Sequence, residues 1–381
     1  MTLKQIATLL NNTIVPNVLG ENAEPIAEDL SNIVDLGKAI EEIDEDTVKD
    51  YAKKFVAGVA KTYFDTREYR KVTPDIFVDS QEYGGVIQRV KSRLLKARDA
   101  VTMSLESGQS YDNHVYNGIE TSNRIYEKDT IFEVWYSIPD NMFKKSFTSA
   151  DGVIGFTSLI ETTVEKTINN ELHALSMRVL NALALSANGT RVVPLRTMYN
   201  NLTGGALEVD DCLTDYEFLQ WTAGVIERLR AYVQDMNLKY NDGEVETFTK
   251  EEDLRVTMLK EFDTALTNKM LSSTFHDNLI KIGKYNTVNA WQSSGTELLP
   301  SIATTGKIVA SLSPITDENS ADTMENVVGL IYDRYSCGIT LTPIPVRADY
   351  NGRGGFTTYY NDQMARYFID TRETAIVLTL N

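Results

Sequence analysis

The chain has 381 residues, of which 42% are hydrophobic, so it is long enough to bury one or two cores. Its formal net charge is −17. A protein that reads a DNA sequence needs a basic face, so this charge argues against such a reader, although it is compatible with a wall that merely surrounds nucleic acid. No stretch approaches the roughly 18 apolar residues that a membrane-spanning helix needs, and we expect no membrane partner.

Residues 1–65 are acidic and have helical spacing. Ile26, Leu30, Ile33 and Val34 recur at the intervals of one helix face. The run EEIDED (41–46) that follows is too polar to lie in a core. We predict an arm of one or two helices that docks on a neighbouring copy or on its own body.

Residues 66–150 combine β-type sequence with a long polar stretch. Gly84 and Gly85 mark a bulge or a tight bend. The stretch MSLESGQSYDNHVYNGIETSN (103–123) is too long for a structureless loop inside a compact domain. It predicts a protruding two-stranded β-arm with its tip near Gly108 or Gly118 and a return strand from Ile125 to Tyr136. An isolated ribbon is only marginally stable in water, so we expect it to lie on a partner surface.

Between Ile154 and Asn188 there is no proline, and the only glycine, Gly155, is at the start. This segment predicts one helix of about 30 residues, roughly 45 Å long. Glu171 and Arg178 are expected to intrude on its apolar face, which disfavours a coiled-coil seam. We predict a helix that lies across a sheet and changes its contacts along its length. The apolar residues of its face are Ile160, Val164, Ile168, Leu172, Leu175, Val179 and Leu183.

Residues 191 to about 337 predict a second α/β region. Thr214 to Glu217 form a capping-box pattern at the start of a helix. Asn241-Asp242-Gly243 predicts a turn, the alternation over 254–258 predicts a strand, and residues 260–271 predict a helix. The predicted buried residues of the two helices are Phe218, Val225, Leu229, Tyr232 and Met236, followed by Phe262, Leu266 and Met270.

The tail from residue 327 returns to strands. Apolar positions at 327–331, 339–341, 359–368 and 375–380 predict four of them. Pro343 and Pro345 interrupt any central strand between the second and the third. Because the last strand is apolar, we expect it to return to the sheet under the long helix.

Few residues suggest chemistry. The three histidines (His114, His173 and His276) form no HExxH motif and no cluster with cysteine, so no histidine-based metal site is expected. The glycine-rich residues 352–355 could cradle a phosphate or form a turn; a turn is favoured, because no GxxxxGK[ST] or GxGxxG motif is present. Cys212 and Cys337 predict two reduced thiols. We expect no cofactor and no enzymatic activity.

Residues 88–98, QRVKSRLLKAR, are basic in an acidic chain. They could contact nucleic acid, or they could form salt bridges with an acidic neighbour such as the EEIDED run of an adjacent copy. We favour the second interpretation, because no aromatic side chains interleave with the charges.

Several stretches in a fixed order carry a resemblance. FVDSQEYGGVIQRV (77–90) is followed by the polar arm, by DTIFEVWYSIPDNMFKKSFTS (129–149) and by the long helix. This order resembles the major capsid proteins of tailed bacteriophages, especially those of the small podophage type. The resemblance implies an α+β, HK97-like capsid fold. Its parts would be an N-terminal arm (1–65), the extended β-loop and the start of the peripheral domain (66–150), the spine helix of that domain (151–190), an axial domain (191–340), and a C-terminal return to the peripheral-domain sheet (341–381).

The resemblance implies a function as well. The chain would be a head protein that assembles with itself into hexamers and pentamers, forming an icosahedral or prolate shell around phage double-stranded DNA. A separate scaffolding protein, a portal protein at one vertex, and a location in the virion capsid after assembly in the host cytoplasm are also implied. The loop residues predicted to contact a neighbouring subunit are Gln109, Tyr111, His114, Tyr116, Arg89 and Arg93.

Two other interpretations stay open from the sequence. An encapsulin-like shell of a cellular compartment shares the fold, but it would need a pocket for a cargo peptide on its inner face. A cytoplasmic α/β enzyme would use the long arm as a lid over a site near Arg347 or Arg353.

Overall fold

The computed structural model describes residues 7–8, 10–12, 15, 25–27, 76, 87–95, 97, 100, 103, 105–110, 114, 116–126, 129–146, 150–273, 285–292, 301–309, 323–344 and 346–381. Most of the predicted N-terminal arm, including the EEIDED run, lies outside these residues, as do Gly84, Gly85 and His276. Ile26 is buried, although residues 25–27 are not helical. Ile76 is also buried, and its carbonyl accepts a hydrogen bond of 2.9 Å from the Ile339 backbone N–H.

The first of two large sheets is antiparallel and is built around one long strand, β12 (Phe356–Ile369). Along one edge β12 pairs with β3 (Asp129–Pro139). Along its other edge it pairs with β10 (Cys337–Pro343) and then with β11 (Arg347–Asn351). The turn between β11 and β12 contains the glycine-rich residues 352–355, where the Asn351 side chain accepts hydrogen bonds from two backbone N–H groups and Gly355 has φ 61°. The turn interpretation of this cluster is confirmed.

The second sheet has the strand order β4–β13–β9–β5–β6. Its strands are β4 (Val192–Pro194), β5 (Leu254–Leu259), β6 (Tyr285–Val288), β9 (Val327–Asp333) and β13 (Ala375–Thr379). The expectation that residues 341–381 return together to one sheet is therefore wrong for the last strand. β13 pairs with β9 and β4, whereas β10 to β12 belong to the first sheet. Ala375 to Leu380 are all buried, so this strand lies inside a core, as predicted.

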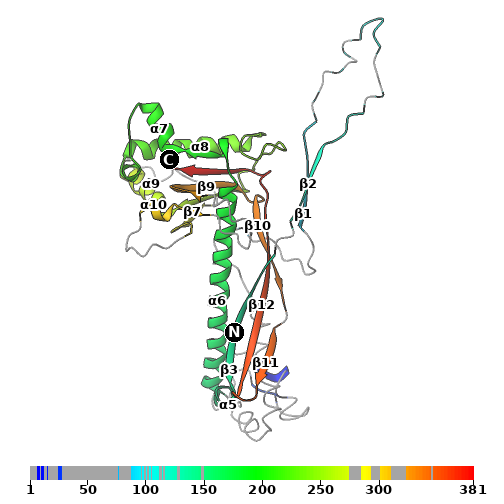
Figure 1. The fold of residues 1–381 in the computed structure, drawn as a ribbon, viewed down its shortest axis with the longest axis vertical. Helices are drawn as coiled ribbons and strands as arrows, with labels where there is room; N and C mark the ends of the chain where they lie inside the picture. Colours follow the sequence, from blue (N-terminus) through cyan, green and yellow to red (C-terminus); the bar gives the residue numbers. More distant parts are fainter. Residues whose placement is uncertain are drawn as a thin grey trace.

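One helix, α6 (Ala150–Leu185), connects the two sheets (Figure 1). It has 36 residues and is about 54 Å long. It begins four residues before the predicted start, packs against α5 (Asp140–Ser146), and ends three residues before the predicted end. Just beyond it, Gly189 has φ 55°, a left-handed conformation that glycine adopts without strain, and the 3-10 helix η2 (Gly189–Arg191) follows.

The predicted apolar face of α6 is confirmed, since all seven of its residues are buried. Glu171 and Arg178 do not intrude on that face: both are exposed, because they lie at its edge and turn toward solvent. The buried surface widens toward the C-terminal end, where Ser176, Met177 and Asn181 are buried too. There α6 leaves β3, β10 and β12 and contacts β7 and β13, so its contacts change along its length as predicted.

Helices cover the second sheet. They are α7 (Leu195–Thr203), α8 (Tyr216–Gln234) and α9 (Lys260–Ser273), with the short segments η3 (Asp210–Leu213), α10 (Ile302–Thr305), β7 (Ile308–Val309) and β8 (Thr323–Met324). The N-cap residue of α8 is Asp215, whereas the predicted capping box begins one residue earlier, at Thr214. The Asp215 carboxylate accepts a 2.7 Å hydrogen bond from the Phe218 N–H. Tyr232 is exposed, and Met236 lies beyond the helix, so both were wrongly predicted as core.

β5 departs from the predicted alternation, because all six of its residues are buried, including Arg255 and Thr257. The strand pairs with β9 along one edge and with β6 along the other, and helix α9 packs against it. Phe262 and Leu266 of α9 are buried as predicted. The Asn241–Gly243 turn is also present, with φ 81° at Gly243.

Both cysteines are free and buried, and burial raises the pKa of Cys212 to about 11 and that of Cys337 to about 12. The reactive thiolate is therefore scarce at pH 8. We expect neither thiol to react with Ellman's reagent in the native protein within minutes, and both to react in 6 M guanidinium chloride. Rapid labelling of a native thiol would contradict this burial.

Candidate functional site

A two-stranded ribbon projects from the body of the molecule (Figure 1). Its strands are β1 (Ile87–Ser92) and β2 (Thr121–Tyr126), which pair antiparallel with Ile87 opposite Tyr126 and Ser92 opposite Thr121. The predicted β-arm is therefore present. Its return strand is shorter than predicted: it ends at Tyr126, and β3 pairs with β12 instead. The reason is burial, because Phe132, Val134 and Tyr136 pack against the hydrophobic core, which the ribbon does not provide.

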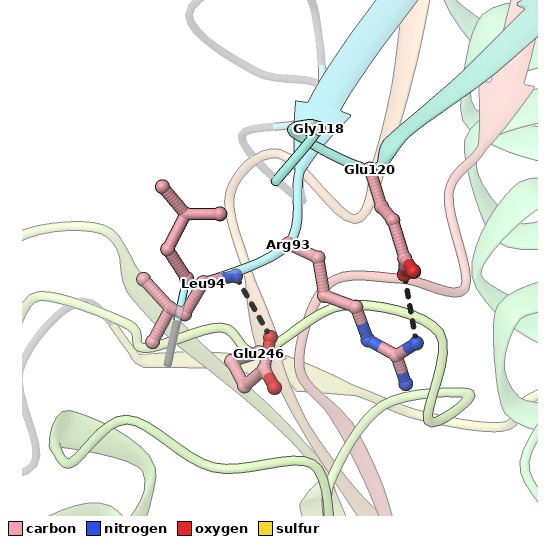
Figure 2. A pocket seen from close by; sticks show the side chains of 6 residues that line it. Arg93, Leu94, Gly118, Glu120 and Glu246 are labelled. Atoms are coloured by element: carbon pink, nitrogen blue, oxygen red, sulfur yellow. Dashed lines mark hydrogen bonds and ion pairs between the residues drawn. The ribbon is translucent and has the colours of Figure 1, made fainter. Parts of the chain in front are cut away.

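The loop between β1 and β2 has its turn at Gly108, which has φ 90°. Gly118, the other predicted tip, lies instead at the base of the loop beside Glu120 (Figure 2). There the two chains of the loop separate and enclose an open cavity of about 480 Å³. Figure 2 shows two of its contacts: Arg93 pairs with Glu120 across the loop at 3.1 Å, and the Leu94 N–H donates to the Glu246 carboxylate at 3.3 Å. The second contact ties the loop base to the body.

The loop exposes large apolar side chains. Met103 and Tyr116 are each 92% exposed. Contiguous exposed apolar surface marks an interaction site in a folded protein. Of the predicted contact residues, Gln109, His114 and Tyr116 are all exposed on this loop, whereas Tyr111 lies outside the described residues. Further exposed apolar residues of the ribbon and loop are Val90, Leu94, Leu95, Leu105, Ile119 and Ile125.

The opposite face of the ribbon is charged and turned toward the body. Arg89 forms ion pairs with Asp370 at 3.3 Å and with Glu373 at 3.0 Å, and Lys91 pairs with Glu373 at 2.7 Å. The predicted partner of this basic run, an acidic stretch of another copy, is thus replaced for Arg89 and Lys91 by acids of the same chain. Strand periodicity explains the change: residues 89 and 91 share one face of β1, and that face lies on the body.

The second strand of the ribbon is held in the same way. Arg124 pairs with Asp242 and with Glu244, each at 2.8 Å, and donates to the Thr371 hydroxyl at 2.7 Å. In the register of the ribbon Arg124 lies directly opposite Arg89. Two like charges so placed repel each other, and the surrounding carboxylates offset this repulsion.

Arg372 joins both strands from beneath. Its guanidinium forms a two-pronged ion pair with Asp370, with both distances at 2.9 Å and both side chains 0% exposed. It also donates to the Ser122 carbonyl at 2.8 Å and to the Arg89 carbonyl at 3.2 Å. Burial alone would raise the pKa of the Asp370 carboxyl, but the hydrogen bonds from Arg372 and the charge of Arg89 outweigh it, and this pKa lies below its ordinary value of 3.8.

The sheet face of β3 that points away from α6 is a second exposed surface. Ile131 is 63% exposed and Trp135 is 66% exposed. Arg347, one of the two candidates of the enzyme interpretation, lies on this open surface and pairs with Asp362 at 2.6 Å and with Glu133 at 3.3 Å. Arg353, the other candidate, is exposed in the turn between β11 and β12. His173 is exposed on α6. Within the described part of the chain, no three His, Cys, Asp or Glu side chains gather to hold a metal, and no helix is both long and apolar enough to span a bilayer.

The comparisons with known proteins agree with this geometry. A chain from the capsid structure of Staphylococcus phage Andhra superposes with a TM-score of 0.54 at 10% identity, over 83% of this chain and 88% of that one. A chain from the structure of the head fiber and inner core protein gp22 of native bacteriophage P68 gives 0.53 at 12% identity, over the same shares. At such identities the likeness shows the fold, which is the α+β HK97-like capsid fold.

No curated protein matches the sequence. The family model of the Phi29-like phage major capsid protein, however, matches residues 12–379, which is nearly the whole chain. This agrees with the resemblance to the podophage type. The chain belongs to the family of Phi29-like phage major capsid proteins.

Proposed function

We propose that the protein builds the phage head by assembling into hexamers and pentamers, in which the ribbon of one copy lies on a neighbouring copy. The observation that carries this proposal is the ribbon itself: its charged face is bound to its own body, while its loop presents Met103 and Tyr116 to solvent. Permanent interfaces are rich in such apolar and aromatic residues. Family membership does not favour the cellular-compartment and enzyme interpretations, and a structural protein needs no active site.

The architecture supports two domains within each copy, one for each large sheet. The sheet of β3 and β10–β12, with α5 and α6, corresponds to the peripheral domain, and the sheet of β4–β6, β9 and β13, with its helices, corresponds to the axial domain. The proposed ranges remain 1–65, 66–150, 151–190, 191–340 and 341–381, with the exception that the last strand belongs to the axial sheet. In this scheme α6 holds the two domains at a fixed separation.

The partners follow from the same proposal. A scaffolding protein guides assembly in the host cytoplasm, a portal protein occupies one vertex, and double-stranded DNA fills the finished virion capsid. The formal charge of −17 keeps free subunits soluble and disfavours tight adhesion of packaged DNA to the wall. No cofactor takes part.

Electron microscopy of the purified protein, expressed with and without a candidate scaffold, tests the proposal. We expect closed particles hundreds of Å across, far larger than one subunit, in at least one of the two preparations. A protein that stays monomeric or dimeric in both, at concentrations where other capsid proteins assemble, would sink the proposal.

Shortening the loop is expected to abolish shell closure without unfolding the subunit. Replacing residues 95–118 with Asn-Gly leaves β1 and β2 joined by a two-residue hairpin turn and leaves their contacts with the body in place. The melting temperature should change little, whereas the yield of closed particles should fall at least about tenfold, because each buried apolar side chain contributes about 1.5–3 kcal/mol.

A full-length variant tests the same contact without shortening the loop. Changing Met103, Leu105, Tyr116 and Ile119 to serine keeps the loop and removes four of its exposed apolar side chains. It should fail to close shells as well. If both variants assemble normally, the loop is not an intersubunit contact.

A further inference from the structure

The ribbon meets the body through a cluster of charges that balance. Four basic side chains and four carboxylates take part, and each is ion-paired within the cluster. We call this cluster the ribbon clamp; its members are Arg89, Lys91, Arg124, Arg372, Asp242, Glu244, Asp370 and Glu373.

The clamp grips the ribbon at two separate places. Acids of the turn between β12 and β13 hold β1 through Arg89 and Lys91, and the turn at residues 242–244 holds β2 through Arg124. One attachment would let the ribbon swing about it, whereas attachments on both strands define a direction. The two turns are also joined to each other, since the Asp242 N–H donates to the Thr371 carbonyl at 2.9 Å and the Thr371 hydroxyl donates to the Asp242 carboxylate at 2.7 Å.

We propose that the ribbon clamp is a positioning device: it fixes the direction of the ribbon in the free subunit, so that the loop meets its neighbour already oriented. The expected effect on assembly rests on the proposed function. The fixed direction of the ribbon in the free subunit does not. A protein segment that is ordered before binding avoids the ordering cost at the moment of association. An unclamped ribbon would bear that cost at every intersubunit contact of the shell.

The outer pairs of the clamp allow this idea to be tested without unfolding the body. Glu373, Asp242 and Arg124 retain some solvent contact, whereas Asp370 and Arg372 have none. The isosteric double variant Glu373→Gln/Asp242→Asn therefore weakens both attachments, because it removes the ion pairs of Glu373 with Arg89 and Lys91 and of Asp242 with Arg124. Asp370 keeps its pairs with Arg372 and Arg89, and Glu244 keeps its pair with Arg124. Glu120→Gln is the matched control, because the Arg93–Glu120 pair joins the two sides of the loop to each other.

Paired spin labels report the direction of the ribbon. One label replaces Gln109 near the loop turn and the other replaces Gln220 on α8; both positions are exposed, and the native cysteines are buried. In the parent and in Glu120→Gln we expect one narrow distance distribution. In the double variant we expect a distribution at least about twice as wide, because long flexible segments sample many directions once their contacts are lost. Arg124→Gln, made from the ribbon side, should broaden it as well.

Assembly kinetics complete the test. If the clamp pre-orients the loop, the double variant should close shells about tenfold more slowly than Glu120→Gln at equal concentration, by light scattering. A narrow distribution in both clamp variants, or a broad one in the parent, would overturn the orientation claim. Assembly of the double variant at the parental rate would overturn its role in assembly. Failure of the parent to form shells would count against the proposed function, and the label distances would still decide the orientation.

Discussion

Asp370→Asn is expected to lower the free energy of unfolding by about 3–5 kcal/mol, because it leaves the Arg372 guanidinium buried without a compensating charge. Both side chains of the pair are 0% exposed, so water does not solvate the guanidinium that is left behind. Urea unfolding followed by circular dichroism measures the difference. The loss should be larger than for Glu120→Gln, whose ion pair is solvent-exposed and contributes at most about 1 kcal/mol.

Removing both partners separates the cost of an unpaired charge from the net value of the pair. Asp370→Leu/Arg372→Met leaves no charge at these two buried positions, and such replacements are often neutral or stabilising. We expect the double variant to be more stable than Asp370→Asn, although the hydrogen bonds from Arg372 to Ser122 and Arg89 are lost. A double variant that is less stable than the single one would show that those hydrogen bonds outweigh the charge.

Acid should erase the difference between the parent and Asp370→Asn. The pKa of Asp370 is lower in the folded state than its ordinary value of 3.8. The stabilisation from its charge is therefore fully present above that ordinary value and is lost as the pH falls through the lower, folded value. Melting temperatures of both proteins should differ most at pH 6–7 and converge only well below pH 3.8. Convergence already at pH 5–6 would contradict the lowered pKa.

Features that depend on neighbouring residues could be predicted from the sequence. The seven apolar residues of α6 repeat at helical spacing, and a helix buries whichever face the repeat marks, so the face could be predicted without any knowledge of its partner. The turn at Gly108 and the hairpin around Gly352–Gly355 likewise follow from neighbouring residues. The helix ends were misplaced by three to four residues, because ends depend on local turns such as that at Gly189.

The pairing partners of the strands were harder to predict, because the residues of a strand do not specify which other strand lies beside it. β3 was assigned to the ribbon and β13 to the first sheet, although both sequences were correctly identified as strands. The contacts that decide the pairing are distant in sequence: β3 binds β12 more than 200 positions away, as in the Ser137–Thr358 contact, which spans 221. The alternation of apolar and polar residues along a strand predicts which of its faces is buried. It does not predict which other element covers that face.

The clamp was missed for the same reason. The basic run at residues 88–98 is evident in the sequence, but its partners lie in the turn at residues 370–373. Arg372 of that turn contacts Arg89 over a separation of 283 positions. One signal was available: Arg89 and Lys91 are two residues apart, and a strand places both on one face. That pattern predicts a charged inner face on β1, and Asp370 to Glu373 is the acidic turn that follows the longest strand of the tail.

Leu172→Ala is expected to cost about 2–5 kcal/mol of stability, because Leu172 lies in the buried face at the middle of α6 and a truncated side chain leaves a cavity. The preceding residue offers a matched control. Glu171 is exposed, and Glu171→Ala changes helix propensity only slightly, so its effect should stay within about 0.5 kcal/mol. Urea unfolding of the free subunit measures both. Because α6 touches both sheets, the loss at Leu172 should appear in one cooperative transition. Two separate transitions, with only one of them shifted, would show that α6 does not couple the two halves and does not act as a rigid spine.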